Sequence, residues 1–406
     1  MTKSIAVLAT LDTKGDEAQF IREQLENLGS RAVLFDIGVI NQPTTSADVT
    51  REEIATAGGK SLADILQDPT REDATPIMAA GTAKLLRGML EAGKIDGAIG
   101  FGGLQGTSLC SRVLQQLPYG FPKIIVSTVA SGDTSAYVDI KDITMMFSVG
   151  DILGLNPFTR KILAKAAGAA HGMAQVEVSL KQESTDKPLI GMSNLGVLTQ
   201  GALEAVRYIH ERGYEVIVFH AIGSGGRAME QMMKEGIIKA VFDYAMGEIA
   251  DEVYSCLRAG GPERLTVAGK LGIPQVLCPG GAEHLGILVE PNAVPEEWKD
   301  HEYVFHSPVV FVPRLRPPEF LKVADDILNR LQHTKGNAVM MLPRGGTGSY
   351  AKEGGPLRDA ECDDIFFEHL KKNLPDGIEA VDRDTHAEDP AFVRECVDRL
   401  IDLIEK

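Results

Sequence analysis

Apolar and polar positions follow two patterns along the chain: short continuous apolar runs, and longer runs with helical spacing. Residues 4–12, SIAVLATLD, form an apolar run typical of a strand covered on both faces. The following DEAQFIREQLENLG places its apolar residues three and four positions apart and ends at Gly29, which predicts an amphipathic helix. RAVLFDIG then predicts a second strand, so the chain begins with a strand, a helix and a strand.

The same order returns in the second half of the chain. PLIGMSNLG, ALEAVRYIHERG and YEVIVFHAIG again predict strand, helix and strand, and the helix again ends at a glycine. Gly29 and Gly213 are 184 positions apart, as are Phe35 and Phe219. Later segments also correspond, for example GFPKIIVST and GIPQVLCPG. We therefore predict a duplicated βα unit in an α/β protein with two Rossmann-like subdomains, each a mainly parallel sheet flanked by helices.

The pattern suggests a division near residue 183. Residues 1–183 would form the N-terminal subdomain, with a helical insertion at about 42–92, and residues 184–406 the C-terminal subdomain. The second half carries additional predicted strands, NAVMMLP and GIEAVD, and additional helices after residue 333. The polar segment KQESTDKP at 181–188 is the best candidate for a linker.

Composition narrows the function classes. The chain has 406 residues and a net charge of −16, which argues against nucleic acid or an anionic membrane as the main partner. Its five cysteines are scattered and form no CxxC pair, so we expect a reducing, cytoplasmic location. No segment approaches the roughly 20 apolar residues of a membrane-spanning helix.

In the first half, several turns that follow predicted strands contain glycines and hydroxyl groups suited to an anion. GFGGLQGTS combines free backbone amides with the start of a helix, the arrangement that binds phosphate. The alternative is a tight crossing of strand and helix, or a turn that caps its own backbone. The candidate ligand-binding residues here are Thr10, Asp12, Lys14, Gly102, Gly103, Gly106, Thr107, Thr128, Ser131 and Gly132. The turn after the first strand lacks GxGxxG, which disfavours a nicotinamide cofactor.

In the second half, titratable side chains follow several predicted strands. His220, Glu248 and His284 would lie on one edge of a parallel sheet, where they could transfer protons or hold a divalent metal. The alternative is that some of them cap helices or form ion pairs. Two glycine-rich turns nearby, FHAIGSGGR and PRGGTGS, add further candidate ligand-binding residues: Gly223, Gly225, Gly226, Arg344, Gly345 and Gly346.

FHAIGSGGRAMEQM, GIPQVL, TLDTKGDE and the GFGG loop together resemble the Tm-1-like ATP-binding family. The resemblance covers nearly the whole chain and implies two Rossmann-like subdomains, ATP binding with or without Mg²⁺, and a homodimer. A plant member of the family carries a following TIM-barrel domain, so the resemblance also suggests a separately encoded TIM-barrel partner. The second half departs from the family pattern around Glu248 and at 282–286, which affects any shared substrate.

Three functional hypotheses follow. The first is a nucleotide-binding protein that holds ATP mainly through the first-half turns. The second is an enzyme that acts on a small acidic metabolite with His220, Glu248 and His284 as acid–base or metal-binding groups. The third is a protein-interaction module, for which a large exposed apolar patch is expected.

Overall fold

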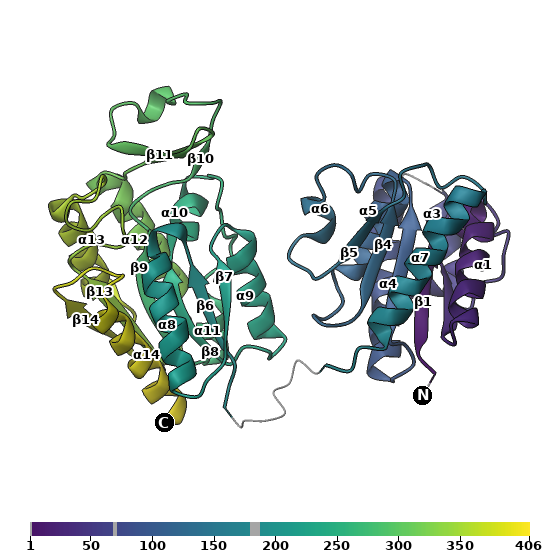
Figure 1. Cartoon of the computed structure of the whole chain (residues 1–406), viewed down its shortest axis with the longest axis horizontal. Coiled ribbons are helices and arrows are strands. Elements are labelled where there is room, and N and C mark those ends of the chain that lie inside the picture. The colour runs from purple at the N-terminus through teal and green to yellow at the C-terminus, as the bar shows by residue number, and fades with distance from the viewer. Residues whose placement is uncertain (1, 68–70, 179–186) are drawn as a thin grey trace. The chain divides into compact units, whose positions relative to one another are not determined.

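The computed structural model describes residues 2–67, 71–178 and 187–406 (Figure 1). The chain divides into two units, residues 1–179 and 180–406. Each unit contains one large sheet with helices on both faces, as the repeated pattern of strands and helices predicts.

The first unit has a five-stranded sheet in the order β2-β1-β3-β4-β5, and all neighbouring strands are parallel. The strands are β1 (Ser4–Ala9), β2 (Arg31–Asp36), β3 (Gly97–Gly102), β4 (Lys123–Ser127) and β5 (Thr144–Phe147). The helices are α1 (Leu11–Asn27), α2 (Arg51–Ala57), α3 (Leu62–Gln67), α4 (Arg71–Glu91), α5 (Leu104–Leu114), α6 (Ser135–Val138) and α7 (Pro157–Ala174).

Two apolar cores cover the two faces of this sheet. One core joins α1 and α7 to side chains such as Val7, Ile99 and Val126. The other core joins the four helices α2, α3, α4 and α5 to the strand side chains on the opposite face, which include Leu8 and Phe35. Because both faces are covered, the strands read as continuous apolar runs rather than as alternating ones.

The second unit has a six-stranded parallel sheet in the order β14-β13-β9-β8-β6-β7. Its strands are β6 (Ile190–Asn194), β7 (Val216–His220), β8 (Ala240–Ala245), β9 (Gln275–Gly280), β13 (Ala338–Pro343) and β14 (Ile378–Arg383). Its helices are η1 (Gly196–Leu198), α8 (Thr199–Glu211), α9 (Ser224–Lys234), α10 (Gly247–Val253), α11 (Val267–Leu271), η2 (Glu296–Trp298), α12 (Pro317–Leu331), α13 (Ala360–Asn373) and α14 (Pro390–Glu405).

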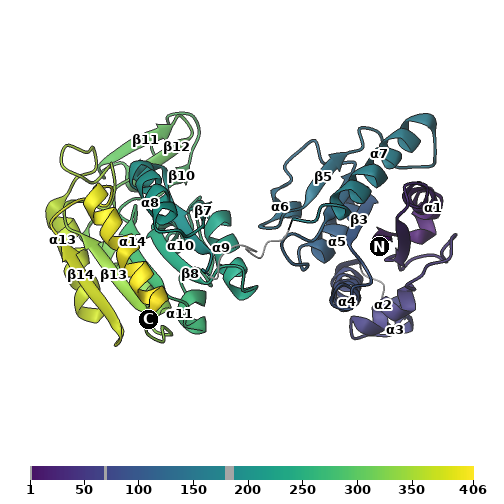
Figure 2. The ribbon, with the colours of Figure 1, turned by 60° about the horizontal axis from the view of Figure 1, so that its bottom comes forward.

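Helices α8 and α14 lie side by side on one face of this sheet (Figure 2). The other face is covered by α9 and α11 at one side and by α10, α12 and α13 at the other. Both predicted C-terminal strands and both predicted C-terminal helices are present, as β13, β14, α13 and α14.

The two sheets share a strand order, which confirms the fold predicted from the repeat. Beginning at β2 and at β7, the orders β2-β1-β3-β4-β5 and β7-β6-β8-β9-β13 match strand for strand. Phe35 pairs with Leu8 in the first sheet, and Phe219 pairs with Ser193 in the second. Asp36 and His220 therefore end equivalent strands.

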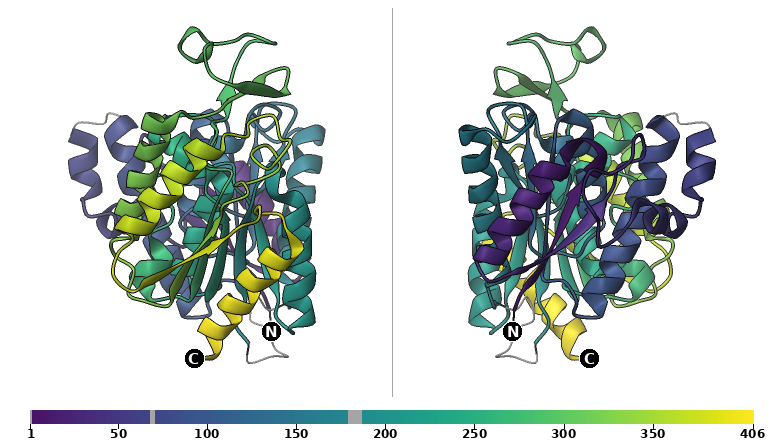
Figure 3. Two further views of the ribbon diagram at one scale, coloured as in Figure 1. Left: turned by 90° about the vertical axis from the view of Figure 1, so that its left-hand side faces the viewer. Right: turned by 90° about the vertical axis from the view of Figure 1, so that its right-hand side faces the viewer.

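A small antiparallel sheet interrupts the second unit between β9 and α12. It has the order β10-β12-β11, with β10 at Ile287–Leu288, β11 at Tyr303–Ser307 and β12 at Val310–Pro313. This small sheet stands out from the body of the unit (Figure 3). The run YVFHSPVVFV, which reads as one strand, is a hairpin because the chain turns at Pro308 and Val309.

The segment from 42 to 92 contains α2, α3 and α4, and α2 begins with a capping box in which Thr50 and Glu53 satisfy each other's backbone amides. Most of the proposed linker, residues 181–186, lies outside the described residues. Within the described part of the chain, no helix combines the length and apolarity needed to cross a membrane.

Candidate functional site

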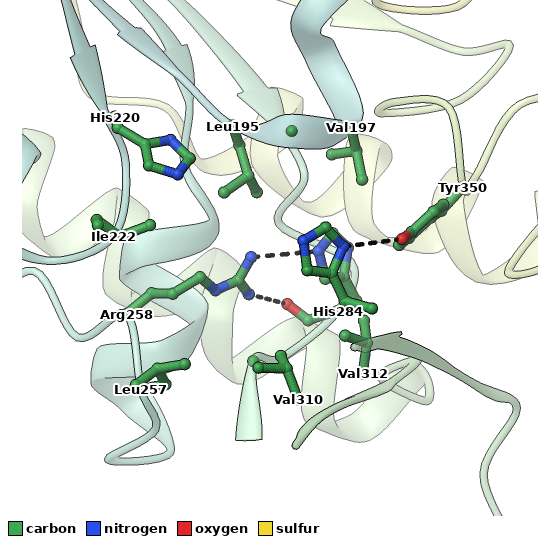
Figure 4. Close-up of a pocket in the computed structure, with 13 residues that line it drawn as sticks. Leu195, Val197, His220, Ile222, Leu257, Arg258, His284, Val310, Val312 and Tyr350 are labelled. Atoms are coloured by element: carbon green, nitrogen blue, oxygen red, sulfur yellow. Dashed lines mark hydrogen bonds between the residues drawn. The ribbon is translucent and has the colours of Figure 1, made fainter. Parts of the chain in front are cut away.

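A cavity of about 400 Å³ opens in the second unit at the carboxyl ends of β6, β7 and β9 (Figure 4). Aliphatic side chains form most of its wall, and a few polar side chains converge on it. The lining residues are Leu195, Gly196, Val197, His220, Ile222, Leu257, Arg258, His284, Gly286, His306, Val310, Val312 and Tyr350. Small-molecule sites have this character, and they favour this edge of a parallel sheet.

A glutamate–histidine pair lies on the turn that follows β9. Glu283 is fully buried, and its Oε1 lies 2.8 Å from Nδ1 of His284. The Thr347 hydroxyl donates to the other oxygen, Oε2, at 2.6 Å. Burial by itself would raise the pKa of this carboxyl, but His284, Arg314 and the Thr347 hydroxyl outweigh it and hold the pKa at about 2. Glu283 is therefore ionised at neutral pH.

Arg258 meets the other side of the His284 ring. Its Nη1 lies 3.2 Å from Nε2 of His284, while Nε and Nη2 donate to Asp251 at 2.9 and 2.8 Å. A guanidinium nitrogen can only donate, so Nε2 of His284 accepts in this contact. We therefore assign the proton of the neutral ring to Nδ1, which donates to Glu283.

The remaining polar groups come from three other segments. His220 ends β7 and is exposed, with Nδ1 3.4 Å from the carbonyl oxygen of Asn194. His306 of β11 places Nδ1 3.3 Å from the Tyr350 hydroxyl. The Tyr350 ring lies 5.8 Å from the His284 ring between centroids. The cavity thus brings together side chains that are up to 155 positions apart in sequence, from Leu195 to Tyr350.

Of the three residues predicted to carry chemistry, His220 and His284 line the cavity and Glu248 does not. Glu248 is fully buried on α10, where Oε1 accepts from the amides of Gly223 at 2.6 Å and Gly226 at 3.0 Å. Its Oε2 accepts from Nε of Arg264 at 2.7 Å. The expected catalytic role of Glu248 is corrected to a structural one, because both of its oxygens are used inside the protein.

Arg264 organises this buried cluster. It is fully buried and donates to Glu248, to Asp243 at 2.6 Å, and to Glu230 at 3.4 Å. Burial raises the pKa of Glu230 to about 7, although Arg264 opposes that shift. A buried arginine with several carboxylates is costly to disrupt, so the cluster fixes the start of α9 against α10.

The glycines of the FHAIGSGG turn are explained by packing around this cluster. A Cβ on Gly225 would lie 1.9 Å from the carbonyl oxygen of His220, and a Cβ on Gly226 would lie 2.0 Å from Oε2 of Glu248. Gly223 has φ +88, a conformation that side chains rarely adopt. The expectation that Gly223, Gly225 and Gly226 bind a ligand is therefore corrected: the helix start does bind an anion, but that anion is Glu248.

The PRGG turn is likewise occupied by the protein itself. Arg344 pairs with Asp382 at 2.5 Å and with Glu368 at 2.5 Å. The Gly345 amide donates to the carbonyl oxygen of Thr385 at 2.8 Å, and the Gly346 amide donates to the carbonyl oxygen of Pro343 at 3.0 Å. These contacts correct the expected ligand-binding role of Arg344, Gly345 and Gly346, and none of the three lines the cavity. The same loop nevertheless supplies Thr347 and Tyr350 to the site.

In the first unit, the predicted residues gather at the carboxyl ends of the strands. Thr10 precedes α1, and its hydroxyl lies 3.0 Å from that of Thr13. Asp12 accepts from the Asn41 amide at 3.1 Å through Oδ2, whereas its buried Oδ1 has no hydrogen-bond partner among the described residues. Lys14 donates to the carbonyl oxygen of Ile152.

The GFGGLQGTS turn joins β3 to α5. Gly103 is the residue before the helix, and no side chain caps the helix start there. Gly102, Gly106 and Thr128 lie around this start. Ser131 and Gly132 follow in an exposed turn. Thr107 is different, because it is fully buried and its hydroxyl lies 2.7 Å from that of Ser127, so its expected contact with a ligand is corrected to a packing contact.

The metal alternative depends on clusters of ligands. Among the described residues, no group of three or more His, Cys, Asp or Glu side chains is arranged to hold a metal ion. His220 and His284 thus share a cavity without forming such a group.

Residues 3–179 match the model of the N-terminal domain of uncharacterised protein family UPF0261, and residues 187–404 match that of its C-terminal domain. The chain belongs to the UPF0261 family. A UPF0261 protein of Clostridium tetani is 36% identical, and the match covers 100% of both chains. A UPF0261 protein of Brucella melitensis is 31% identical over 96% of this chain and 92% of its own.

The expected relation to the Tm-1 protein is also found. The ToMV resistance protein Tm-1 of Solanum lycopersicum is 28% identical over 98% of this chain and 55% of its own length. Among solved structures, MurG of Acinetobacter baumannii is 14% identical with a TM-score of 0.21, and the match covers 100% of this chain and 99% of that one.

Arg258, Thr347 and Tyr350 are the functional candidates that the sequence did not indicate. Arg258 lies in a loop without glycine repeats before it, and its partner Asp251 stands seven positions earlier on α10. Tyr350 follows the PRGGTGS turn, in which the glycines and Arg344 are the residues that the sequence marks as candidates. The adjacency of Glu283 and His284 was the one signal in the sequence that could have pointed to the pair.

Proposed function

We propose that the second unit of this UPF0261 protein is an enzyme that binds a small organic acid and exchanges a proton with it through His284. The observation that carries this proposal is the chain of contacts from Glu283 through His284 to Arg258, which ends at an apolar cavity. A histidine oriented by a buried carboxylate is a common general base, and Arg258 is suited to an anionic oxygen.

The contacts suggest how a ligand would activate His284. Nε2 of His284 accepts from Arg258 and in this contact is not available to a substrate proton. An anionic oxygen that takes the hydrogen that Nη1 of Arg258 now donates to His284 would release Nε2. The freed nitrogen could then take the proton that arrives with the acid, and the ionised Glu283 would stabilise the imidazolium through Nδ1. The imidazolium would act as the general acid towards the bound substrate, and His220 on another wall of the cavity would be the base that accepts a carbon-bound hydrogen.

Asp251 and Thr347 keep Arg258 and Glu283 in position. Asp251 holds two nitrogens of Arg258 and also accepts from the Gly286 amide at 3.0 Å. Thr347 holds Glu283. His220, on another wall of the cavity, is placed to contact a second polar group of the ligand (Figure 4). Aliphatic walls lower the local dielectric and strengthen these interactions.

Exchange of carbon-bound hydrogen with solvent tests this proposal. The protein is incubated in deuterium oxide with α-ketoisocaproate, whose hydrogens next to the carbonyl are acidic, and exchange is followed by NMR. We expect catalysed exchange in the wild type, a loss of at least about a hundredfold in His284→Gln, and near-normal exchange in His333→Gln, a histidine outside the cavity. Equal rates in the wild type and His284→Gln would refute the role of His284.

A second candidate function, ATP binding, concerns the first unit. It is supported by the uncapped start of α5, whose amides and helix dipole favour phosphate. The unpartnered oxygen of Asp12 would suit Mg²⁺, which prefers carboxylate oxygens. In the second unit the corresponding helix, α10, carries Glu248 in its first turn, whereas α5 has no acidic side chain there. Of these two helix starts, the one in the first unit is therefore better suited to phosphate.

A matched pair of substitutions at Gly103 separates this function from simple packing. Gly103 has φ −73, and a Cβ there would meet nothing closer than the Thr128 hydroxyl at 3.9 Å, so a side chain is tolerated. Gly103→Asp places a carboxylate at the helix start, whereas Gly103→Asn adds the same shape without charge. Calorimetry with Mg-ATP should show affinity falling at least about tenfold in Gly103→Asp and changing little in Gly103→Asn. Equal affinities in the two variants would contradict phosphate binding at α5.

The resemblance to the Tm-1-like family further leads us to propose a homodimer and a TIM-barrel protein as partners. Because the tomato relative is named as a ToMV resistance protein, we also propose a protein-interaction role as a further alternative. Sedimentation of the full chain tests the dimer, and a chain that sediments as a monomer over the micromolar range would exclude it.

A further inference from the structure

Resting on the proposed proton exchange at His284, we infer that the ligand of the second-unit cavity is a compact aliphatic monocarboxylate, taken up together with one proton. The inference depends on three features of the cavity: the number of donors that it offers, the balance of charge around His284, and the character of its wall.

The cavity offers a small number of donors to an anion. Of the three nitrogens of Arg258, Nε and Nη2 are held by Asp251, and Nη2 also donates to the carbonyl oxygen of His284 at 2.8 Å. Nη1 contacts Nε2 of His284 and has a second hydrogen to offer. Once His284 is protonated, Nη1 and Nε2 can each donate to one oxygen of a carboxylate. This pair of donors matches a planar carboxylate group.

The charges around His284 are balanced when its ring is neutral. The charged groups around it are Glu283 and Arg258, which contact the ring, Asp251, which pairs with Arg258, and Arg314, which acts on Glu283 and is linked to Asp363 and Arg358. Tyr350 and His306 are the other titratable groups nearby. Glu248 acts on Arg258 from the separate Arg264 cluster. Three carboxylates thus face three guanidinium groups. A monoanion that arrives with one proton preserves this balance.

A dianion would upset the balance. Arg258 is the permanent cation among the described residues that line the cavity, and Asp251 already neutralises it. A phosphate monoester or a nucleotide would bring at least one uncompensated negative charge into an apolar cavity, which is strongly unfavourable. The same argument separates this site from the start of α5 in the first unit.

The wall of the cavity favours an aliphatic body. Leu195, Val197, Ile222, Leu257, Val310 and Val312 supply it. The cavity volume of about 400 Å³ is near the lower end for small-molecule sites, so the body should be compact. Burial of each additional methylene is expected to raise affinity roughly fourfold until the cavity is filled.

Calorimetry on the full chain tests the inference with acetate, isovalerate, isocaproate, isobutyl phosphate and the neutral isocaproamide as probes. Titrations in buffers of different ionisation enthalpy give the number of protons taken up. We expect affinity to rise from acetate to isocaproate, isobutyl phosphate to bind at least about tenfold more weakly than isovalerate, and uptake of about one proton per carboxylate at a pH where His284 is neutral. Affinity that does not depend on chain length, or tighter binding of the phosphate, would overturn the inference.

Two neighbouring valines provide matched variants that leave the buried charges intact. Val310 lines the cavity, whereas Val309 is 40% exposed and does not line it. Val310→Phe should fill the cavity and lower isocaproate affinity at least about tenfold, and Val309→Phe should bind as the wild type does. Equal effects in the two variants would overturn the location of the site.

The outcomes also distinguish this inference from the proposed function. Carboxylate binding in the expected order without proton uptake would refute proton exchange at His284, while the ligand class would stand. Isocaproamide binding as tightly as isocaproate, together with deuterium exchange that needs His284, would refute the ligand class and leave the proposed function intact.

Discussion

Glu283 Oε1 lies 2.8 Å from Nδ1 of His284, and both side chains are buried beside the cavity of the second unit. The contact fixes the ring so that its other nitrogen faces Arg258 and the cavity. The carboxylate thus serves two purposes, since it orients the ring and stabilises a proton on it.

The low pKa of Glu283 makes a prediction about stability and pH. Its pKa is lowered from the ordinary value of 4.5 to about 2, so the ionised form stabilises the fold above about pH 4.5 and this contribution disappears as the pH falls to about 2. Glu283→Gln should therefore be less stable than the wild type in urea unfolding at neutral pH, by roughly 1–3 kcal/mol, because one amide oxygen cannot accept from both His284 and Thr347. The difference should shrink towards pH 2, and a difference that stays constant with pH would contradict the assignment.

The start of α9 leads to a second prediction. Gly226→Ala would push a methyl group into the contact between Glu248 and Arg264, so we expect a loss of at least about 3 kcal/mol in the free energy of unfolding. Gly168 of α7 is the matched control, because a Cβ there would meet nothing within 4 Å. Gly168→Ala should be neutral or stabilising by up to about 1 kcal/mol. Comparable losses in both variants would show that the buried cluster is not the cause.

A third prediction concerns a strained residue in the first unit. Val149, in the loop between β5 and α7, has φ +64 and is 64% exposed. A β-branched residue in this conformation is strained by about 1–2 kcal/mol, and its exposed side chain offers little packing in return. Val149→Gly should raise stability, because glycine adopts this φ without strain. The gain should be at most about 1 kcal/mol, because glycine loses more entropy on folding. Val149→Ala keeps the unfavourable φ, so a gain of the same size there would contradict the explanation.

Much of the fold could be predicted from the sequence. The equal spacing of Gly29 and Gly213, and of Phe35 and Phe219, reflects a repeated strand order, and the two sheets have that order. The apolar runs were readable because both faces of each sheet are covered. The hairpin at 303–313 is hard to recognise from the sequence because its short turn, Pro308-Val309, is flanked on both sides by residues that favour strands.

The site was harder to predict, because a strand-end rule gives the edge of the sheet and not the partner of each side chain. His220 and His284, which the rule puts at this edge, both line the cavity. The rule could not tell that Glu248 turns towards the amides at the start of the preceding helix, α9, since that depends on how α9 and α10 pack. Arg258 and Tyr350 reach the cavity from loops whose paths only the tertiary structure defines.

Nitrogen NMR of isotope-labelled histidine tests the central claim, that His284 is an acid–base group that Glu283 orients and that takes up a proton when an anion binds. The resonances of His284 are identified because they disappear in His284→Gln and shift in Glu283→Gln. In the free protein at neutral pH, Nδ1 of His284 should carry the proton and Nε2 should be bare. On saturation with isocaproate, both nitrogens should become protonated. A free protein with the proton on Nε2, or a ring whose protonation is unchanged at saturation, would contradict the account.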